Sequence, residues 1–498
     1  MAKSIMIQGT TSNAGKSLLC AGLCRILHQE GVKVAPFKAQ NMALNSFITG
    51  EGLEMGRAQV VQAECAGIAP SVKMNPILLK PHSDVGSQVI VHGVPRGVMP
   101  AREYYQYKKE LKKEVLAAYE ALAETCDVVV IEGAGSPAEI NLREDDLVNM
   151  GMAEMARAPV LICGDIDRGG VFASLYGTLA LLRPEEQALV KGTIVNKFRG
   201  DVEILRPGLA MLEELMGKPV VGVVPMLDVD IDDEDSLSTR LERRAGKVGL
   251  IDIAVVRLPR LSNFTDFNPL ERMEEVTLRY VKSPAELGKP DLVILPGTKN
   301  TMDDLRWLRE SGLEAAVLRH AAAGGPVVGI CGGYQMLGRA VSDPEGVESG
   351  GSLRGLGLLD TETVFLGEKT RTQVTGRFQN VEGCFSPMAG VECKGYEIHM
   401  GVTRTAGAPL LELQGGLAPV DGRSAGNVWG CYIHGIFDQA GCARTLVNCL
   451  RRRKGLGESE SAVVDWDAYQ QQQYDKLADG LRAGLDMDLV HRIIDEGV

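Results

Sequence analysis

The sequence lacks several features that would place it in other classes of protein. No apolar stretch approaches the ~20 residues that a membrane-spanning helix needs. Neither Cys-x-x-Cys nor His-x-x-x-His occurs among 11 cysteines and 7 histidines, so we expect no structural zinc site. Positive charge is also in deficit, because 53 Lys and Arg face 65 Asp and Glu for a formal net charge of −12. This balance argues against general binding to nucleic acid or to an anionic membrane.

The opening segment, Met-Ala-Lys-Ser-Ile-Met-Ile-Gln-Gly, has too short an apolar run for a secretory signal. The cysteines therefore predict reduced thiols in the cytoplasm rather than a disulfide framework. A chain of 498 residues is too long for one hydrophobic core, which predicts two or three domains. The oligomeric state stays open at this stage.

Short Val- and Ile-rich runs alternate with amphipathic stretches, a pattern typical of an α/β fold with a parallel sheet. In the first half the expected strands are residues 5–9, 32–38, 127–132, 159–165, 193–197 and 220–224, with helices at 16–29 and 103–124. A second such pattern has strands at 251–256 and 291–295, a helix at 303–323 and a strand leading to Cys331. We expect one domain over 1–227, an acidic connector over 228–248, a second domain over 249–443 and a helical C-terminal extension over 444–498.

A loop of small residues joins the first expected strand to the first expected helix. In Gly9-Thr-Thr-Ser-Asn-Ala-Gly-Lys-Ser17, small residues let backbone N–H groups converge on a phosphate at the helix N-terminus. The lysine suits the outer phosphates and the serine hydroxyl suits Mg²⁺. Five residues separate the glycines, one more than in the usual phosphate loop. We predict that Gly9, Thr10, Gly15, Lys16 and Ser17 bind ATP with Mg²⁺; a structural turn is the alternative.

Carboxylates end two later strands, Glu132 before Gly-Ala-Gly135 and Asp165 before Ile-Asp-Arg-Gly-Gly170. Ligands bind at the carboxyl edge of an open parallel sheet, and Mg²⁺ takes one or two carboxylates beside phosphate oxygens. We therefore predict Ser17, Glu132 and Asp165 as metal ligands, with a helix cap or turn as the alternative for either carboxylate.

Other polar residues are expected near the same edge. The predicted contacts to substrate or to the transferring phosphoryl group are Lys38, Gln40, Asn41, Asp167 and Arg168. Arg168 is otherwise a surface ion pair, and Asn196 either reads the adenine or forms a turn.

Cys331 closes an apolar run in Pro326-Val-Val-Gly-Ile-Cys-Gly-Gly-Tyr-Gln335. Gly329-x-Cys331-x-Gly333 has the spacing of a nucleophile elbow, where a strand turns sharply into a helix and exposes the side chain. We predict that Cys331 attacks a carboxamide and that the N–H groups of Gly332 and Gly297 stabilise the oxyanion. An inert buried thiol is the alternative, and is our prediction for the other ten cysteines.

A thiol nucleophile needs a histidine brought in from elsewhere in the sequence. His434 ends the apolar run Val428-Trp-Gly-Cys-Tyr-Ile-His434 and is the predicted partner; His399 in Gly395-Tyr-Glu-Ile-His399 competes. A purely structural histidine is the alternative for each.

Together these segments resemble the cobyric acid synthase family of glutamine-dependent amidotransferases. The resembling segments, in order, are residues 9–17, 37–42, 74–81, 132–136, 165–172, 196–200, 331–335, 396–399 and 434–437. The first half is similar to the dethiobiotin synthetase group of P-loop enzymes, and the second to a flavodoxin-like class I glutamine amidotransferase domain. Most members of that class carry a glutamate two residues after the histidine, where this chain has Ile436, as the cobyric acid synthase branch does. The group that orients His434 is left open.

The resemblance implies ATP- and glutamine-dependent amidation of the b, d, e and g carboxylates of adenosylcobyrinic acid a,c-diamide. A carboxylate would be phosphorylated to an acyl phosphate, and glutamine would release ammonia through a thioester at Cys331. A corrinoid and glutamine are thus the implied partners, and the corrinoid rests on the resemblance alone.

Two other functions are alternatives. A sister enzyme that amidates the a and c carboxylates of cobyrinic acid has the same two-domain logic; the segment 165–170 and the length of the first half favour the first choice. A P-loop ATPase that positions chromosomes or division sites leaves the Cys331 half unexplained.

Overall fold

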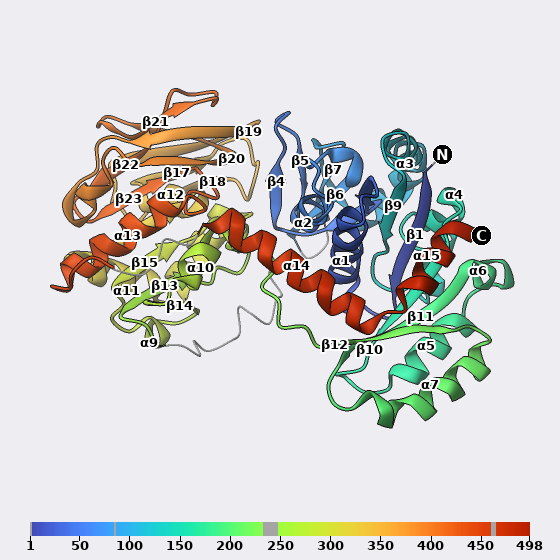
Figure 1. Cartoon of the computed structure of the whole chain (residues 1–498). Coiled ribbons are helices and arrows are strands. Elements are labelled where there is room, and N and C mark those ends of the chain that lie inside the picture. The colour runs from blue at the N-terminus through green and yellow to red at the C-terminus, as the bar shows by residue number, and fades with distance from the viewer. Residues whose placement is uncertain (1, 84–85, 233–247, 460–464) are drawn as a thin grey trace. The chain divides into compact units, whose positions relative to one another are not determined.

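The computed structural model of the protein describes residues 2–83, 86–232, 248–459 and 465–498. Most of the predicted connector, residues 233–247, lies outside these ranges. The chain forms two compact units (Figure 1). The nucleotide unit comprises Met1–Ala43, Met55–Asp232 and Gln470–Val498, and the thiol unit comprises Leu44–Glu54 and Asp233–Tyr469. Each unit is discontinuous in sequence, whereas the predicted domains are continuous.

Six parallel strands form the main sheet in the described part of the nucleotide unit, in the order β12-β11-β10-β1-β9-β2. They are β1 (Lys3–Gly9), β2 (Val34–Phe37), β9 (Val128–Glu132), β10 (Val160–Asp165), β11 (Val190–Phe198) and β12 (Val220–Pro225). From β1 the sheet grows to one side through β9 and β2 and to the other through β10 to β12. The carboxyl end of β1 therefore lies at a topological switch point, where open α/β sheets bind ligands. The predicted parallel α/β fold is confirmed for this unit.

Helices cover this sheet: α1 (Lys16–Gln29), α2 (Arg57–Cys65), α3 (Ala101–Ala123), α4 (Met150–Ala156), α5 (Val171–Ala180), α6 (Pro184–Leu189) and α7 (Val202–Met216). The end of the chain, α14 (Trp466–Gly484) from Gln470 onward and α15 (Met487–Glu496), also belongs to the unit. The close packing of α14 on α1 needs a glycine, because a Cβ at Gly22 would lie 2.2 Å from Leu481 Cδ1. A salt bridge of 2.8 Å between Arg25 and Asp475 joins the same two helices.

A smaller sheet in the nucleotide unit has the order β3-β6-β7-β8. Its strands are β3 (Gln40–Met42), β6 (Ile77–Ser83), β7 (Gly86–Val91) and β8 (Val94–Pro100). Between β3 and α2 the chain forms β4 (Ser46–Ile48) and β5 (Glu54–Gly56), which pair with each other.

The thiol unit is built on the parallel strands β14-β13-β15-β16-β23, numbered 2-1-3-4-5 along the chain, which is the flavodoxin-like order. They are β13 (Ile251–Val256), β14 (Val276–Val281), β15 (Leu292–Leu295), β16 (Val327–Ile330) and β23 (Val428–Cys431). The sheet continues beyond β23 through β22 (Val420–Ala425), β21 (Pro409–Gln414), β19 (Thr361–Phe378), β17 (Ala340–Asp343) and β18 (Gly351–Arg354). Off this path, β20 (Glu392–Thr405) pairs with β19. The predicted flavodoxin-like class is confirmed.

Helices of this unit are α8 (Asn268–Arg272), α9 (Pro284–Leu287), α10 (Thr301–Glu310), α11 (Leu313–Ala322), α12 (Gly332–Leu337) and α13 (Ala440–Arg453). The single helix predicted over 303–323 is wrong, because Gly312 takes a φ of 77° and separates α10 from α11. In the part of the chain that the structure describes, no helix combines the length and the apolar character needed to cross a membrane.

Candidate active sites

Cys331 lies at the sharp turn between strand β16 and helix α12. Its φ of 51° and ψ of −110° place a non-glycine residue in a sparsely populated region, which is typical of a nucleophile elbow. The turn is anchored, because Cys331 N donates to Cys431 O at 2.8 Å. Gly333 lets α12 approach β15, since a Cβ there would lie 1.9 Å from Leu295 O. The sequence predicted an exposed sulfur, but the residue is only 7% exposed, because the surrounding segments close over the elbow.

His434 lies three residues after β23 and meets Cys331. Its Nδ1 is 2.7 Å from Asp266 Oδ2, and its ring forms a hydrogen bond with the Cys331 side chain. Because Nδ1 faces Asp266, Nε2 is the nitrogen left for the thiol. Burial lowers the pKa of His434, but the charges of Asp266 and Cys331 and the hydrogen bonds with both outweigh burial and raise the pKa to about 10. The imidazole therefore holds its proton through neutral pH.

Asp266 was not among the predicted residues. It lies in the short helix η4 (Phe264–Phe267), is 3% exposed, and accepts from Gly435 N at 2.9 Å with its other oxygen. It thus faces the Nδ1 side of His434, while Ile436 is fully buried among apolar residues. Asp266 and His434 are 168 positions apart, so no sequence spacing indicated the contact.

The two predicted oxyanion donors lie beside this pair. A Cβ at Gly297 would sit 2.8 Å from His434 Cε1, and one at Gly332 would sit 2.6 Å from Thr298 Cγ2 and 3.2 Å from Thr298 N. Gly332 therefore allows the start of α12 to approach the turn after β15, and Gly297 allows that turn to approach His434. The structure brings Cys331, His434, Gly297 and Gly332 into one cluster.

His399, the competing histidine, faces other groups. Its Nδ1 contacts Gly401 O at 2.8 Å, its ring stacks on Tyr432 at 3.6 Å, and its Nε2 is 3.7 Å from Glu397. The contact from this strand to the thiol comes from the backbone, since Cys331 Sγ donates to Ile398 O at 3.7 Å. The geometry therefore favours His434 as the partner of Cys331.

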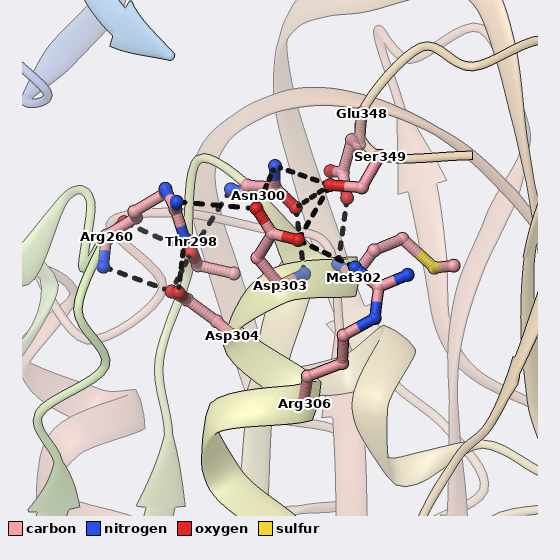
Figure 2. A network of polar contacts seen from close by, with 9 residues as sticks. All are labelled: Arg260, Thr298, Asn300, Met302, Asp303, Asp304, Arg306, Glu348 and Ser349. Carbon is pink, nitrogen blue, oxygen red and sulfur yellow. Dashed lines mark hydrogen bonds and ion pairs between the residues drawn. The ribbon is translucent and has the colours of Figure 1, made fainter. Parts of the chain in front are cut away.

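A polar network fixes the turn that carries Gly297 and Thr298 (Figure 2). Asp304, with no exposed surface, accepts from Thr298 Oγ1 at 2.5 Å and from Arg260 N at 3.1 Å. Asn300 caps α10 by accepting from Asp303 N at 2.9 Å. Burial raises the pKa of Asp304 to about 6, although Thr298 and Arg260 oppose the shift. The network holds the turn from the side of α10.

In the nucleotide unit, the predicted phosphate loop joins β1 to α1 as expected. Gly15 has a φ of 98°, and a Cβ there would lie 2.0 Å from Asn196 Nδ2. Gly9 is less confined, because its Cβ would lie 3.0 Å from Lys16 Nζ and from Thr11 O. Lys16 Nζ donates to Thr11 O at 2.9 Å and to Gly135 O at 3.1 Å. The N–H of Thr10 donates to Cys163 O at 2.9 Å, so this amide is used by the sheet.

Glu132 is the centre of a buried cluster next to the loop. One carboxylate oxygen accepts from Ser17 Oγ at 2.8 Å and from Lys38 Nζ at 2.9 Å. The other accepts from Gln62 at 2.5 Å and from Gln59 at 3.4 Å. Both glutamines lie on α2 and escaped the sequence analysis, since side-chain amides on a helix carry no motif. Ser17 and Glu132 are thus brought together, as a shared Mg²⁺ requires.

Asp165 lies at the other flank of β1, with different partners. Its carboxylate is 2.8 Å from Lys197 Nζ and 3.8 Å from the exposed Arg168, and it accepts from Asp167 N at 2.9 Å. Asp167 itself pairs with the exposed Arg199 at 3.1 Å. In this structure, both carboxylates of the loop form ion pairs with basic side chains.

Asn196 and Lys197 form hydrogen bonds with the backbone of the phosphate loop. Asn196 Nδ2 donates to Ala14 O at 2.8 Å, and Lys197 Nζ donates to Asn13 O at 2.6 Å. The amide of Asn196 therefore serves the loop backbone in this structure.

A cavity of about 560 Å³ opens beside Lys16 in the nucleotide unit. Gly135, whose carbonyl accepts from Lys16, belongs to its lining together with Gln40. Its apolar lining includes Met42, Leu79, Met99, Tyr105 and Val148, and its charged lining includes Lys108, Glu139, Arg143, Asp146 and Glu186. Gln40 Oε1 accepts from Tyr104 O–H at 2.5 Å. Asn41 instead donates to Gln59 at 3.1 Å and so joins the Glu132 cluster.

Comparison with known proteins identifies two types of domain in the chain. Residues 5–237 match the model of the CobQ/CobB/MinD/ParA nucleotide binding domain, and residues 252–441 match that of the CobB/CobQ-like glutamine amidotransferase domain. A protein of Ruminiclostridium cellulolyticum is 58% identical over 100% of this chain and 98% of its own. One of Lachnoclostridium phytofermentans is 56% identical over 100% of both chains, and one of Yersinia enterocolitica is 53% identical over 99% and 98%. All three relatives are named cobyric acid synthase.

Proposed function

Because this chain belongs to the cobyric acid synthase family, we propose that it amidates corrinoid carboxylates with nitrogen from glutamine and energy from ATP. The acceptors are the b, d, e and g carboxylates of adenosylcobyrinic acid a,c-diamide. The observation that carries the proposal is the Cys331–His434–Asp266 cluster on the same chain as a phosphate loop.

Glutamine hydrolysis takes place at Cys331. The sulfur attacks the side-chain carbonyl carbon as a thiolate paired with the protonated His434, and the oxyanion that forms is stabilised by the N–H groups of Gly332 and Gly297. His434, whose raised pKa of about 10 keeps it protonated, delivers a proton to the leaving nitrogen and ammonia departs. The thioester that remains is hydrolysed by water to glutamate, which restores the thiol. Asp266 holds the imidazole with Nδ1 directed toward itself.

The acceptor carboxylate is activated in the nucleotide unit. Transfer of the terminal phosphoryl group of ATP gives an acyl phosphate and ADP; ammonia then displaces phosphate and forms the amide. Lys16 neutralises charge on the phosphates, and Gly9, Thr10, Gly15 and Asn196 complete the loop around the nucleotide.

Ser17 and Glu132 fit a magnesium ion, because a hydroxyl and a carboxylate oxygen lie 2.8 Å apart beside the phosphate loop. When bound, Mg²⁺ offsets the charge that develops on the transferring phosphoryl group. Asp165 is proposed as a further ligand, and it would exchange its contact with Lys197 for the ion. Lys38 would neutralise charge beside Glu132.

We place the acceptor in the cavity beside Lys16, where Gln40 is one of the lining residues. The apolar residues in its lining suit the face of a corrin ring, and Lys108 and Arg143 in the same lining suit peripheral carboxylates. Asn41, Asp167 and Arg168 are proposed as contacts to substrate or phosphoryl group. The free thiols of all eleven cysteines suit a reducing cytoplasm.

The test is mass spectrometry of the corrinoid acid incubated with the protein, MgATP and glutamine. We expect four successive conversions of carboxyl to carboxamide on the a,c-diamide. Two conversions on cobyrinic acid itself would instead indicate the a,c-diamide synthase. ATP hydrolysis with no amidation of any corrinoid acid would contradict the proposal and favour a positioning ATPase.

A further inference from the structure

Leu44–Glu54, here called the excursion, is contributed to the thiol unit by the half of the chain that forms the nucleotide unit. The residues before and after it, through Ala43 and from Met55, belong to the nucleotide unit. The chain thus leaves one unit after β3 and returns to it before α2. The contacts of the excursion indicate a role for it.

The excursion lies behind the imidazole of His434. The ring of Tyr396 stacks on the ring of His434 with centroids 5.5 Å apart, and the two residues exchange backbone hydrogen bonds of 2.9 and 3.1 Å. Phe47 packs its ring against the Tyr396 ring at 5.4 Å. The Tyr396 hydroxyl donates to Ser46 O at 3.0 Å. The excursion therefore contacts Tyr396, which in turn packs against His434.

The same residue, Ser46, also reaches the loop that carries Asp266. Ser46 N donates to Asn263 Oδ1 at 3.1 Å, and Asp266 N donates to Asn263 O at 3.1 Å. Asn263 has a left-handed φ of 51° and is 2% exposed. One peptide segment thus contacts the supports of both members of the Asp266–His434 pair.

The far end of the excursion is fixed by a buried ion pair. Glu54 and Lys369 are 2.6 Å apart, with side chains 0% and 9% exposed, and the Gln373 side chain donates to Ile48 O. A charge pair so little exposed is strongly destabilised if one partner leaves. The excursion is therefore held to the thiol unit along its length.

Both flanks of the excursion end in the Glu132 cluster. Before it, Asn41 donates to Gln59 at 3.1 Å. After it, α2 brings Gln59 and Gln62 to the carboxylate that Ser17 also contacts. The residues of the Glu132 cluster are therefore linked to both ends of the excursion through a few residues of chain.

We propose that the excursion is a positioning element that couples the nucleotide site to glutamine hydrolysis. Binding of MgATP and the corrinoid acid to the nucleotide unit fixes the positions of Ser46 and Phe47. These residues in turn position Tyr396 and Asn263, so that His434 is aligned with Cys331. The proposal rests on the proposed function and adds a regulation to it. Such coupling is a free-energy difference between two states and must be measurable as an activation ratio.

The experiment compares glutamine hydrolysis with and without MgATP plus the corrinoid acid. In the unaltered protein the ligands should raise kcat for glutamine by about 5-fold or more, a usual size for coupling between sites. Phe47→Ala, at a half-buried position, should bring the ratio close to one with little change in KM for glutamine. Amidation with free ammonium, which needs only the nucleotide unit, should stay intact. Phe47→Leu should restore part of the ratio.

Val402→Ala is the matched control, because Val402 is 47% exposed on the same strand as Tyr396. Asn263→Gly is the second variant should Phe47→Ala not fold: glycine accepts the left-handed φ and removes only the acceptor of Ser46 N–H. It should lower the ratio as well.

An unchanged ratio in Phe47→Ala, or in Asn263→Gly if that is the folded variant, overturns the proposal. So does a ratio of one in the unaltered protein that amidates normally. A protein that neither hydrolyses glutamine nor amidates the corrinoid acid overturns the proposed function itself, which is a distinguishable result.

Discussion

The two sites use the same local design, a parallel strand that turns into a helix, with opposite choices of residue at the turn. Cys331 takes a φ of 51° and Gly15 takes a φ of 98°. A non-glycine residue in such a conformation costs about 1–3 kcal/mol, which the thiol site accepts because its reagent is a side chain. In the phosphate loop the reagents are backbone N–H groups, and a Cβ would meet Asn196. The residue at the turn therefore differs with the reacting group: it is a cysteine where a side chain reacts, and a glycine where backbone N–H groups bind the ligand.

The buried carboxylates of the two sites differ in a similar way. Asp266 and Glu132 are 3% and 1% exposed. Asp266 serves one imidazole and the backbone N–H beside it, whereas Glu132 is shared by four side chains. In the mechanism that we propose, Asp266 orients the imidazole that carries the proton, and Glu132 is a ligand of the magnesium ion.

Cys331→Ser should separate the activities of the two sites most strongly. Because the thiolate forms the thioester, glutamine-dependent amidation should fall by about 10³-fold or more, while ammonium-dependent amidation persists. Amide formation from each nitrogen source is the measurement. Cys384→Ser, at a half-buried thiol of the same unit, is the control and should keep both activities. Continued use of glutamine by Cys331→Ser would remove the assignment of the nucleophile.

Asp266→Asn should reduce glutamine hydrolysis by on the order of 10⁴-fold, as loss of an orienting carboxylate does elsewhere. The pKa of His434, raised to about 10 by Asp266 and Cys331 against the effect of burial, should drop. The proton on His434 is then lost at a lower pH, so the alkaline limb of the pH–rate profile moves downward.

Glu397→Gln is the comparison for this prediction, because it alters the surroundings of His399. It should leave the profile in place. A shift with Glu397→Gln and none with Asp266→Asn would make His399 the working histidine.

Lys16→Met should lower amidation with both nitrogen sources by roughly 10²-fold, the scale of losing one charge-stabilising group at a reacting centre. Glutamine hydrolysis measured without ATP depends on the thiol unit alone and should continue. Steady-state rates with glutamine and with ammonium test this. Lys109→Met, at a side chain 69% exposed, should change neither, and equal losses in both variants would refute a specific role for Lys16.

The smallest effect is expected at Asp304. Burial raises its pKa to about 6, so its favourable contribution is complete below the unfolded value near 4 and is lost as the pH rises through about 6. Asp304→Asn removes this dependence, and its stability relative to the unaltered protein should rise by about 1–3 kcal/mol between pH 4 and 8. Thermal midpoints across that range measure the difference. Asp360→Asn, at an exposed position, should show no such trend.

The sequence predicted those features that depend on neighbours along the chain. The phosphate loop, the elbow at Cys331 and the order of the parallel strands follow from local spacing and from runs of Val and Ile. Asp266, Gln59 and Gln62 could not be found in this way, because their roles arise from contacts between segments far apart in sequence. The break at Gly312 was missed for another reason: an apolar periodicity continues through 303–323, and one glycine in a left-handed conformation was enough to end the helix.

The interleaving of the chain has a consequence for how such enzymes can be divided or recombined. A protein cut once in its acidic connector would yield an N-terminal piece without α15 and the part of α14 that packs on Gly22. The C-terminal piece would lack Glu54, and with it the ion pair to the buried Lys369. Neither fragment would contain every segment of one unit, so exchange of one half between relatives has to carry the excursion and the terminal helices along with it.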